Sequence, residues 1–513
     1  MIIILKNDNY MDEKENNTES NIKYLYGASV RGIQDFIFQT NKLKEIVGGS
    51  ELVEQICTTE FDDYAENGES IVRAAGNIKH IFSNRKDCEE AVRNFPRKVM
   101  TMAPGITINQ AVVTLGKDES DYAAKYNELE NLLQAQRNKA SRLMMLGLMS
   151  ISRAPSTGLP AVKAEKDGLI DAASEQKIRQ YEATKKLAEK FFGKRLKDEE
   201  IAYNIENITD KNNWIAVIHA DGNGMGSIFQ EVGKHKNDMR KISPEVSRIT
   251  EYAAQKAFSS IESMFEDSKI IPIRPVVLGG DDLTLICRAD LALEYAKTFL
   301  EEFETASLGL KNLGLEETSQ KVVEKGLTAC AGIAFVKSSY PFHYAVHLAE
   351  SLCRRAKKTA KTLNEEAKSL PPSCLMFHKV QDSFIEDFDE IVKRELTPRK
   401  NLTFEYGPYY CGERAKKFGI DNSNTVNDLL DKVQELKQAG DKKEYNAVKS
   451  NLRQWITLLF DNPEAANQRM KRIRKVSKTA EKYIDEKYEN VNTIKKIPFF
   501  DILSLASLNI KTK

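Results

Sequence analysis

The stretch Pro275-Val-Val-Leu-Gly-Gly-Asp-Asp-Leu-Thr-Leu-Ile-Cys287 predicts two apolar strands joined by a short turn. Gly279 and Gly280 are expected to supply the positive backbone angles of a tight hairpin. Two adjacent carboxylates, Asp281 and Asp282, would then stand at its tip. Gly and Asp are common turn formers, so a plain turn explains these residues if nothing else in the chain bears on them.

The elements predicted around this hairpin occur twice along the chain in the same order. The first copy has strands at 23–29, 70–75, 78–82 and 106–116, with helices at 32–64, 86–100 and 121–140. The second has strands at 214–220, 272–278, 283–287, 326–336 and 374–378, with helices at 244–265, 291–305 and 342–368. The order strand, helix, strand, strand, helix, strand is that of a ferredoxin-like unit, an antiparallel sheet with helices on one face. We therefore predict an α+β protein in which two such units pack as a pseudo-dimer.

The remaining segments divide the chain into five predicted parts. These are a flexible tail at 1–22, the first unit at 23–143, a linker with a helical insertion at 144–213, the second unit at 214–380 and a helical domain at 381–513. The linker contains a Pro/Ser/Gly-rich stretch at 153–160, which is followed by a Lys/Glu-rich helical stretch. In the helical domain, a basic run between Arg469 and Lys482 predicts either a solvated helix face or a polyanion site.

Composition bounds the class of protein. The 513 residues are 41% hydrophobic and 29% charged with a net charge of +1, which is ordinary for a globular protein and gives no bulk attraction for nucleic acid. There is no apolar run of about 18 residues and no secretory signal pattern, so we expect a cytoplasmic protein without a membrane partner. Seven cysteines stand singly without a Cys-x-x-Cys pair, so no zinc site is predicted.

A third acid is predicted to join the hairpin pair. The strand at 214–220 ends on Asp221, and the first strand of a ferredoxin-like unit lies beside the hairpin strands. Asp221, Asp281 and Asp282 would repel one another unless cations neutralise them. Mg²⁺ or Mn²⁺ prefers all-oxygen ligands, and two such ions are the frame of two-metal phosphoryl transfer. The three acids are therefore candidate metal ligands and catalytic residues.

Phosphate-binding residues are predicted next to these acids. The glycine-rich loop after Asp221 leaves its amides open to phosphate oxygens, although such a loop alone is usually only a turn. Lys357 could reach a triphosphate from the helix at 342–368, or be solvated at its surface. The nucleotide-binding candidates are Gly222, Asn223, Gly224, Met225, Gly226, Gly279, Gly280 and Lys357.

These motifs resemble the palm domain of the large subunit of type III CRISPR-Cas effectors, the Cas ten family, which is related to diguanylate cyclases. The resemblance rests on Asp221-Gly-Asn-Gly-Met-Gly226, on Leu278-Gly-Gly-Asp-Asp282, on the small-residue strand around Gly332 and on the helix from Ala349 to Lys357. Val30-Arg-Gly-Ile-Gln-Asp-Phe-Ile-Phe38 and Lys44-Glu-Ile-Val-Gly-Gly-Ser50 resemble the first, degenerate palm of that family. Ser156-Thr-Gly-Leu-Pro-Ala161 resembles the segment that follows its linker.

The resemblance implies synthesis of cyclic oligoadenylates from ATP in antiviral defence. A 3′-hydroxyl would attack an α-phosphate and pyrophosphate would leave. Asp221, Asp281 and Asp282 would hold two Mg²⁺ or Mn²⁺ ions, and Lys357 would contact phosphate. Guide RNA and other effector subunits are the implied partners.

Some features depart from the family pattern. Asn223 stands where the family often has a second acid, and the paired cysteines of its zinc site are missing. None of the six histidines is followed by Asp, so we expect no His-Asp nuclease. Two alternatives stay open: a diguanylate-type cyclase that uses GTP, or a catalytically silent scaffold that binds RNA and other subunits.

Overall fold

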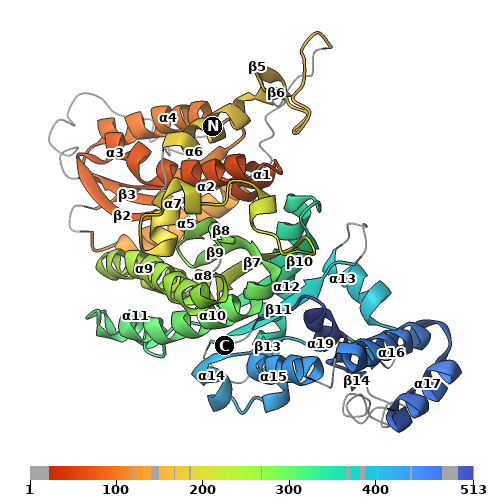
Figure 1. Ribbon diagram of the computed structural model, residues 1–513. Helices are drawn as coiled ribbons and strands as arrows, with labels where there is room; N and C mark the ends of the chain where they lie inside the picture. Colours follow the sequence, from red (N-terminus) through yellow and green to blue (C-terminus); the bar gives the residue numbers. More distant parts are fainter. Residues whose placement is uncertain are drawn as a thin grey trace, which may run out of the picture.

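A computed structural model describes residues 22–74, 76–116, 119–139, 149–166, 168–183, 186–266, 268–363, 370–381, 387–400, 402–438, 442–476 and 495–511. The tail predicted at 1–22, the start of the linker and the end of the basic run at Lys478 and Lys482 lie almost wholly outside these residues. Three layers follow one another in Figure 1: the first sheet with its helices, the second sheet with its helices, and a mainly helical C-terminal part.

The first sheet has the strand order β2-β3-β1-β4, and all its pairs are antiparallel. Tyr26 on β1 packs on one face with Phe61 of α3 and Phe82, and Gly27 packs on the other face against Leu129 and Leu133 of α5. Its strands are β1 (Lys23–Arg31), β2 (Gly68–Ala74), β3 (Asn77–Phe82) and β4 (Thr107–Leu115). Its helices are α1 (Ile33–Phe38), α2 (Leu43–Cys57), α3 (Thr59–Ala65), α4 (Arg85–Met102) and α5 (Tyr122–Arg137).

The second sheet has the order β13-β11-β10-β7-β9-β8, so its last four strands repeat the order of the first sheet. A parallel strand, β11, follows β10 through α12, and β13 pairs with β11 at the edge. The strands are β7 (Trp214–Gly222), β8 (Ile273–Gly279), β9 (Asp282–Arg288), β10 (Ala329–Lys337), β11 (Cys374–Lys379) and β13 (Tyr409–Tyr410). The helices are α8 (Met225–Val232), α9 (Lys236–Ile261), α10 (Ala292–Ser307), α11 (Glu317–Val323) and α12 (Phe342–Thr362).

These two sheets confirm the predicted α+β fold with two ferredoxin-like units. The helices inside each unit share a face as expected, and a further helix covers the opposite face. In the second unit, Tyr295 of α10 lies near Cys287 on one face, whereas α12 approaches Gly332 on the other. Cys287 pairs with Ala216 and Gly332 pairs with His219, and neighbouring odd and even positions of a strand face opposite sides.

The turn between β8 and β9 corrects one detail of the prediction. Gly280 has a positive φ of 61°, but Gly279 is not in the left-handed region because it still pairs with Asp282 as the last residue of the strand. The turn therefore consists of Gly280 and Asp281. Glycine with positive φ at the first turn position is favoured in two-residue hairpins.

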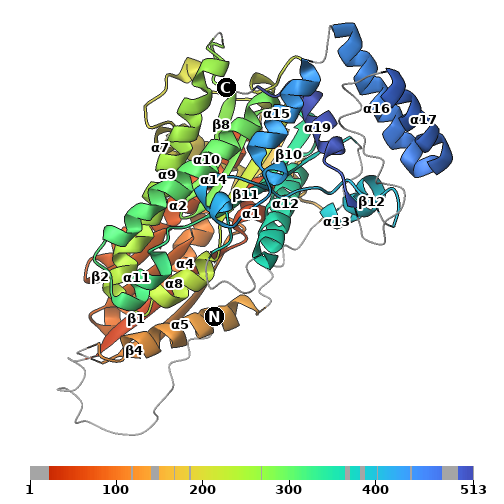
Figure 2. The same cartoon turned by 90° about the horizontal axis from the view of Figure 1, so that it is seen from below.

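The two units pack on each other, with α2 against β8 and α9 against β2 (Figures 1 and 2). Between them in sequence, the linker forms a hairpin that the periodicity does not predict and two helices that it does. These elements are β5 (Ala161–Glu165), β6 (Gly168–Asp171), α6 (Ala172–Ala183) and α7 (Lys186–Phe192).

The C-terminal part is mainly helical, as predicted. The basic residues from Arg469 to Lys475 lie on α17, where Arg469 bonds Asn451 of α16 at 2.6 Å. The elements are α13 (Phe388–Ile391), β12 (Leu402–Thr403), α14 (Gly412–Lys417), α15 (Val426–Lys437), α16 (Lys442–Asp461), α17 (Pro463–Val476), β14 (Lys495–Lys496) and α19 (Phe499–Ala506). Among the described residues, no helix combines the length and apolarity needed to cross a membrane.

Candidate metal and nucleotide site

The register of the second sheet brings the predicted acids together. Ala220 of β7 pairs with Leu283 of β9, so the next residues along, Asp221 and Asp282, lie opposite each other at the end of the two strands. Asp281 occupies the turn beside them, and its carboxylate lies 2.8 Å from the position that a Cβ on Gly222 would take. All three predicted acids therefore lie at one end of the sheet.

His219 joins this cluster, and it was not among the sequence candidates. One ligand atom each from His219, Asp221 and Asp282 lies within 4.8 Å of the others. His219 is two residues before Asp221 and so shares its face of β7, and its Nδ1 is 3.0 Å from the Thr284 hydroxyl. The alternation in Ile-His-Ala-Asp221 could have indicated this placement, since positions 219 and 221 of a strand face the same side.

Lys357 reaches the cluster from α12. Its ammonium donates to the Asp221 carboxylate and, at 2.7 Å, to the Gly222 carbonyl oxygen. The close approach of α12 to β10 at Gly332 makes this possible, because a Cβ there would lie 1.9 Å from the Ala349 carbonyl oxygen. Lys357 thus contacts one of the predicted acids, and its contact with phosphate stays a prediction.

The electrostatics of the three acids differ. Burial acts to raise the pKa of Asp221, but the Lys357 ammonium outweighs it and holds that pKa below its usual value. Burial, and then the negative charge of Asp221, raise the pKa of Asp281 to about 7. Burial and the charges of Asp281 and Asp221 raise the pKa of Asp282 well above its usual range. One lysine therefore does not compensate three acids, and the residual negative charge fits a divalent cation.

The predicted phosphate-binding loop connects β7 to the N-terminus of α8. Gly224 has a positive φ of 69°, a backbone conformation that favours glycine. Gly226 has open space around its Cα and is exposed in the first turn of α8. The helix N-terminus and the exposed glycines can accept an anion at this point. Met225, by contrast, is buried and packs in the core.

Asn223 has a different environment from the rest of the loop. Its amide nitrogen Nδ2 donates to the Thr328 hydroxyl at 3.0 Å, and its backbone N–H donates to the Thr328 carbonyl at 2.7 Å. Its side-chain oxygen accepts from the Cys330 thiol at 3.2 Å, and the residue is 2% exposed. The donors of Asn223 thus fix the loop on Thr328, the residue before β10, whereas Gly224 and Gly226 of the loop are exposed.

A cavity of about 480 Å³ lies between the two units next to the acids. Gly279 and Asp282 of the second hairpin line it, and so does Gly76 in the corresponding turn of the first unit. Further parts of the wall come from α1, α2 and α7, including Glu54, whose carboxylate pairs with Lys190 of α7 at 3.0 Å. This volume is within the range of small-molecule sites.

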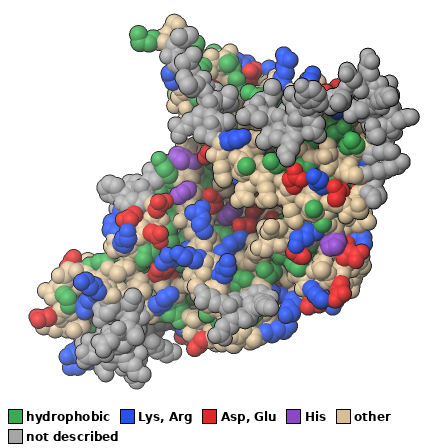
Figure 3. All heavy atoms as spheres, turned by 180° about the vertical axis from the view of Figure 1, so that it is seen from behind, with side chains coloured by type: hydrophobic (Ala, Val, Ile, Leu, Met, Phe, Trp, Pro, Cys, Tyr) green, Lys and Arg blue, Asp and Glu red, His purple; other side chains and the backbone are tan. Residues whose placement is uncertain are grey.

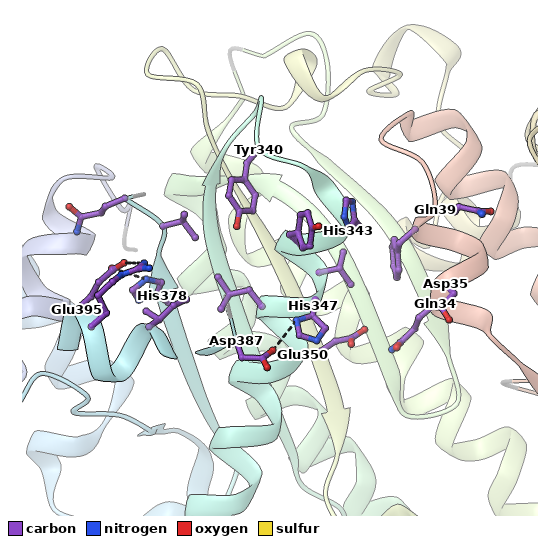
Figure 4. Close-up of a pocket in the computed structure, with 18 residues that line it drawn as sticks. Gln34, Asp35, Gln39, Tyr340, His343, His347, Glu350, His378, Asp387 and Glu395 are labelled. Atoms are coloured by element: carbon purple, nitrogen blue, oxygen red, sulfur yellow. Dashed lines mark hydrogen bonds and ion pairs between the residues drawn. The ribbon is translucent and has the colours of Figure 1, made fainter. Parts of the chain in front are cut away.

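A second cavity, of about 720 Å³, lies over the N-terminal half of α12 and contains none of the predicted site residues. His343, His347 and Glu350 of α12 face it, Asp35 lies across it on α1, and His378 closes it near Glu395 (Figure 4). His347 Nδ1 is 4.0 Å from the Asp387 carboxylate. From behind, histidine and acidic side chains are visible in a hollow of the surface (Figure 3).

Comparison with known proteins identifies the domain that carries the acids. Residues 214–365 match the model of the Cas10/Cmr2 second palm domain. No curated protein matches the chain. A chain in the crystal structure of a Csm1-Csm4 cassette in complex with cA4 is similar over 96% of this protein and 70% of its own length, with 12% identity and a TM-score of 0.52. The cassette in complex with AMPPNP gives 12% identity, the same coverage and a TM-score of 0.47.

The family match covers the whole constellation of Asp221, the glycine-rich loop, the Gly-Gly-Asp-Asp hairpin and Lys357. The similarity to the cassette chain extends the shared fold over nearly the whole protein. Residues 214–365 of this protein are therefore similar to the Cas10/Cmr2 second palm domain.

Proposed function

We propose that this protein is a metal-dependent nucleotidyl cyclase that converts ATP into cyclic oligoadenylate as a signal in type III CRISPR defence. The observation that carries the proposal is the convergence of Asp221, Asp281 and Asp282 at the edge of a cavity between two palm-like units. A scaffold gains nothing from three acids whose mutual repulsion opposes folding.

The roles of the residues follow from their positions. Asp221 and Asp282, with Asp281 beside them, would hold two divalent cations, which supply charge neutralisation at the reacting phosphate. The His219 imidazole beside them favours Mn²⁺ over Mg²⁺ as the better occupant. The exposed glycines at the start of α8 would receive triphosphate oxygens, and the cavity between the units would hold the nucleoside.

Lys357 has two consecutive roles in this proposal. Without ligand, its ammonium neutralises Asp221. With cations bound to the acids, the Lys357 side chain would be free to bind a phosphate oxygen as a point charge. The reaction itself is the attack of a 3′-hydroxyl on an α-phosphate, which forms a phosphodiester bond and releases pyrophosphate; the last attack closes the ring.

The wider setting is part of the same proposal. The similar chain comes from a cassette that contains Csm4 and, in one crystal, cA4. We extend this setting to the present protein, with an effector subunit and a guide RNA as partners and the cytoplasm as its place. We also propose that the two palm-like units extend over residues 23–143 and 214–380.

Product formation tests the proposal directly. Purified protein is incubated with Mn²⁺ or Mg²⁺ and each of the four nucleoside triphosphates, with and without RNA, and the products are identified by mass spectrometry. We expect oligoadenylate from ATP, and no product from the double variant Asp281→Asn/Asp282→Asn.

A matched control is available in the first unit. Asp62 and Asp63 are also adjacent acids, but they lie on the surface of α3, with 60% and 69% of their side chains exposed. Asp62→Asn/Asp63→Asn should keep full activity. Equal product from the hairpin double variant would refute the site, product from GTP alone would favour the diguanylate-type reaction, and no product from any nucleotide would favour a scaffold.

A further inference from the structure

A second cluster of like charges lies at the opposite end of the same sheet. Lys337 ends β10 and pairs with Trp214 at the start of β7, and Lys379 ends β11. Lys449 and Arg453 come from α16, four residues apart and so on one face of that helix. These four residues, Lys337, Lys379, Lys449 and Arg453, are here termed the basic cluster.

Sheet register places part of the cluster on the face that does not carry the acids. Lys379 pairs with Phe335, which lies two residues before Lys337 on β10. Residues two apart on a strand face the same side, so both lysines share a face. Asp221 pairs with Cys330 and lies on the other face. The basic cluster is thus separate from the metal and nucleotide site on two counts, the end of the sheet and its face.

The contacts inside the cluster are close. The ammonium groups of Lys337 and Lys379 lie 4.3 and 4.6 Å from the centre of the Trp214 ring. Lys379 is only 9% exposed, and its ammonium donates to the Ser507 hydroxyl at 2.5 Å. Lys337 donates to the Asn212 carbonyl oxygen at 2.6 Å. Neutral oxygens and one ring are therefore the partners of these two cations.

No acid pairs with the basic cluster among the residues that the structure describes. Two other lysines with little exposure do pair with a carboxylate: Lys79 pairs with Glu130, and Lys236 pairs with Glu119 at 2.6 Å. Burial, followed by the charges of Arg453, Lys337 and Lys449, lowers the pKa of Lys379 to about 8. The fold therefore contains a buried cation beside three others, an arrangement that costs free energy. A bound anion would remove this cost.

We propose that the basic cluster is a binding site for a phosphate group, either of an RNA strand or of free phosphate. Lys379 would form its floor, and the exposed Lys337 and Arg453 would close on the anion from the sheet and from α16. Because α16 and the sheet contribute cations from distant parts of the sequence, a bound phosphate would also hold the C-terminal part against the second palm. This site does not depend on the proposed cyclase activity.

Two variants of the full-length protein test the site with two probes. The variants are Lys379→Met and Lys449→Gln/Arg453→Gln. The probes are inorganic phosphate, followed by the thermal midpoint at constant ionic strength, and a 5′-fluorescein single-stranded RNA of mixed sequence, followed by anisotropy. Arg85→Gln/Arg93→Gln on α4 is the control. It removes the same charge as the α16 double variant, but from exposed residues of the first unit.

We expect phosphate to raise the thermal midpoint of the wild type and of the control, and to leave that of Lys379→Met unchanged. Without phosphate, Lys379→Met should melt at or above the wild-type temperature, since it removes a buried charge, and this shows that the variant folds. For RNA, the α16 double variant should bind about tenfold more weakly, and the slope of log affinity against log salt should fall by about 1.4.

The outcomes separate the two sources of phosphate. Loss of both responses assigns the site to an RNA strand, and loss of the phosphate response alone assigns it to free phosphate. If the phosphate response and the RNA affinity of both variants equal those of the control, the basic cluster is not a phosphate site.

Discussion

Asp221 illustrates how much of the site one side chain controls. It pairs in the sheet with Cys330, lies next to Asp282 and accepts from Lys357. The Lys357 ammonium holds the pKa of Asp221 low, whereas burial and then the charge of the neighbouring acids raise the pKa values of Asp281 and Asp282. The arrangement leaves negative charge for a divalent ion.

Replacing Lys357 by Gln should expose that charge. Asp221 then loses its counter-charge, and the free energy of unfolding should fall by about 1–3 kcal/mol in metal-free buffer, a value reduced because both groups are partly exposed. Mn²⁺ should restore the thermal midpoint, and its stabilising effect should be larger than in the wild type. Calorimetry with and without Mn²⁺ measures both.

Lys358→Gln is the matched control for this variant, since Lys358 is the exposed neighbour on α12. It should respond to Mn²⁺ as the wild type does. If Lys357→Gln gains no more from Mn²⁺ than Lys358→Gln, the acids near Asp221 do not form a cation site.

At the scale of elements, the docking of α12 onto β10 is what positions Lys357. Gly332 permits it, because Ala349 O and Cys353 N occupy the space that any Cβ would need. The thiol of Cys353 also donates to the Cys330 carbonyl at 3.1 Å, so the helix and the strand are bonded as well as packed. A single glycine therefore sets the distance between α12 and the three acids.

Gly332→Ala should separate the two elements. The added methyl would lie 1.9 Å from the Ala349 carbonyl oxygen, so α12 has to shift. We expect overpacking to lower the free energy of unfolding by about 1–3 kcal/mol. We also expect oligoadenylate synthesis to fall by a larger fraction than the free energy of unfolding. Denaturant unfolding and the product assay provide the two readings.

Gly309→Ala is the corresponding control, since nothing lies within 4 Å of its added Cβ and its φ is negative. It should leave stability and product within error of the wild type. Equal behaviour of the two alanine variants would show that close packing at Gly332 does not position the site.

At the scale of the molecule, each sheet contains a buried histidine that titrates far below its usual pH. Burial, and then the charge of Arg73, lower the pKa of His80 on β3 to about 4. Burial, and then Arg394, lower the pKa of His378 on β11 to about 4. His80 lies against Phe61 and Phe82, so its ring has an aromatic environment in which a charge is costly.

These histidines should make both units sensitive to acid. Between pH 6.5 and 4 the unfolded chain binds more protons than the folded chain at these two sites, so their contribution to stability falls as the pH falls. At pH 5 the loss is about 2 kcal/mol for each histidine relative to pH 7.5. Urea unfolding at both pH values, in the wild type and in His80→Gln/His378→Gln, measures this effect.

Buried carboxyls oppose this trend in the whole protein. Burial raises the pKa of Glu51 and Asp501 to about 7, and acid therefore stabilises the fold through them. The test is for that reason the difference between variant and wild type, in which these carboxyls cancel. A difference that does not change between pH 7.5 and pH 5 would mean that the histidines are not buried in neutral form.

The repeat of strand and helix periods determined the two sheets and their order, because alternation and helical spacing are local properties of the chain. The same reasoning placed Asp221 beside the Gly-Gly-Asp-Asp hairpin, since register in a known sheet order leaves little freedom. Whether these acids hold metal stays a prediction.

Only the tertiary structure decided which groups meet across distant segments. Lys357 contacts Asp221 because α12 docks at Gly332, and Asn223 turns inward to Thr328. The charges of Lys449 and Arg453 on α16 act on Lys379 at the end of the sheet. No periodic pattern in the sequence indicates these arrangements, because each depends on the distance between two packed elements. Local patterns therefore determined the frame of the protein, and long-range packing decided where its charges converge.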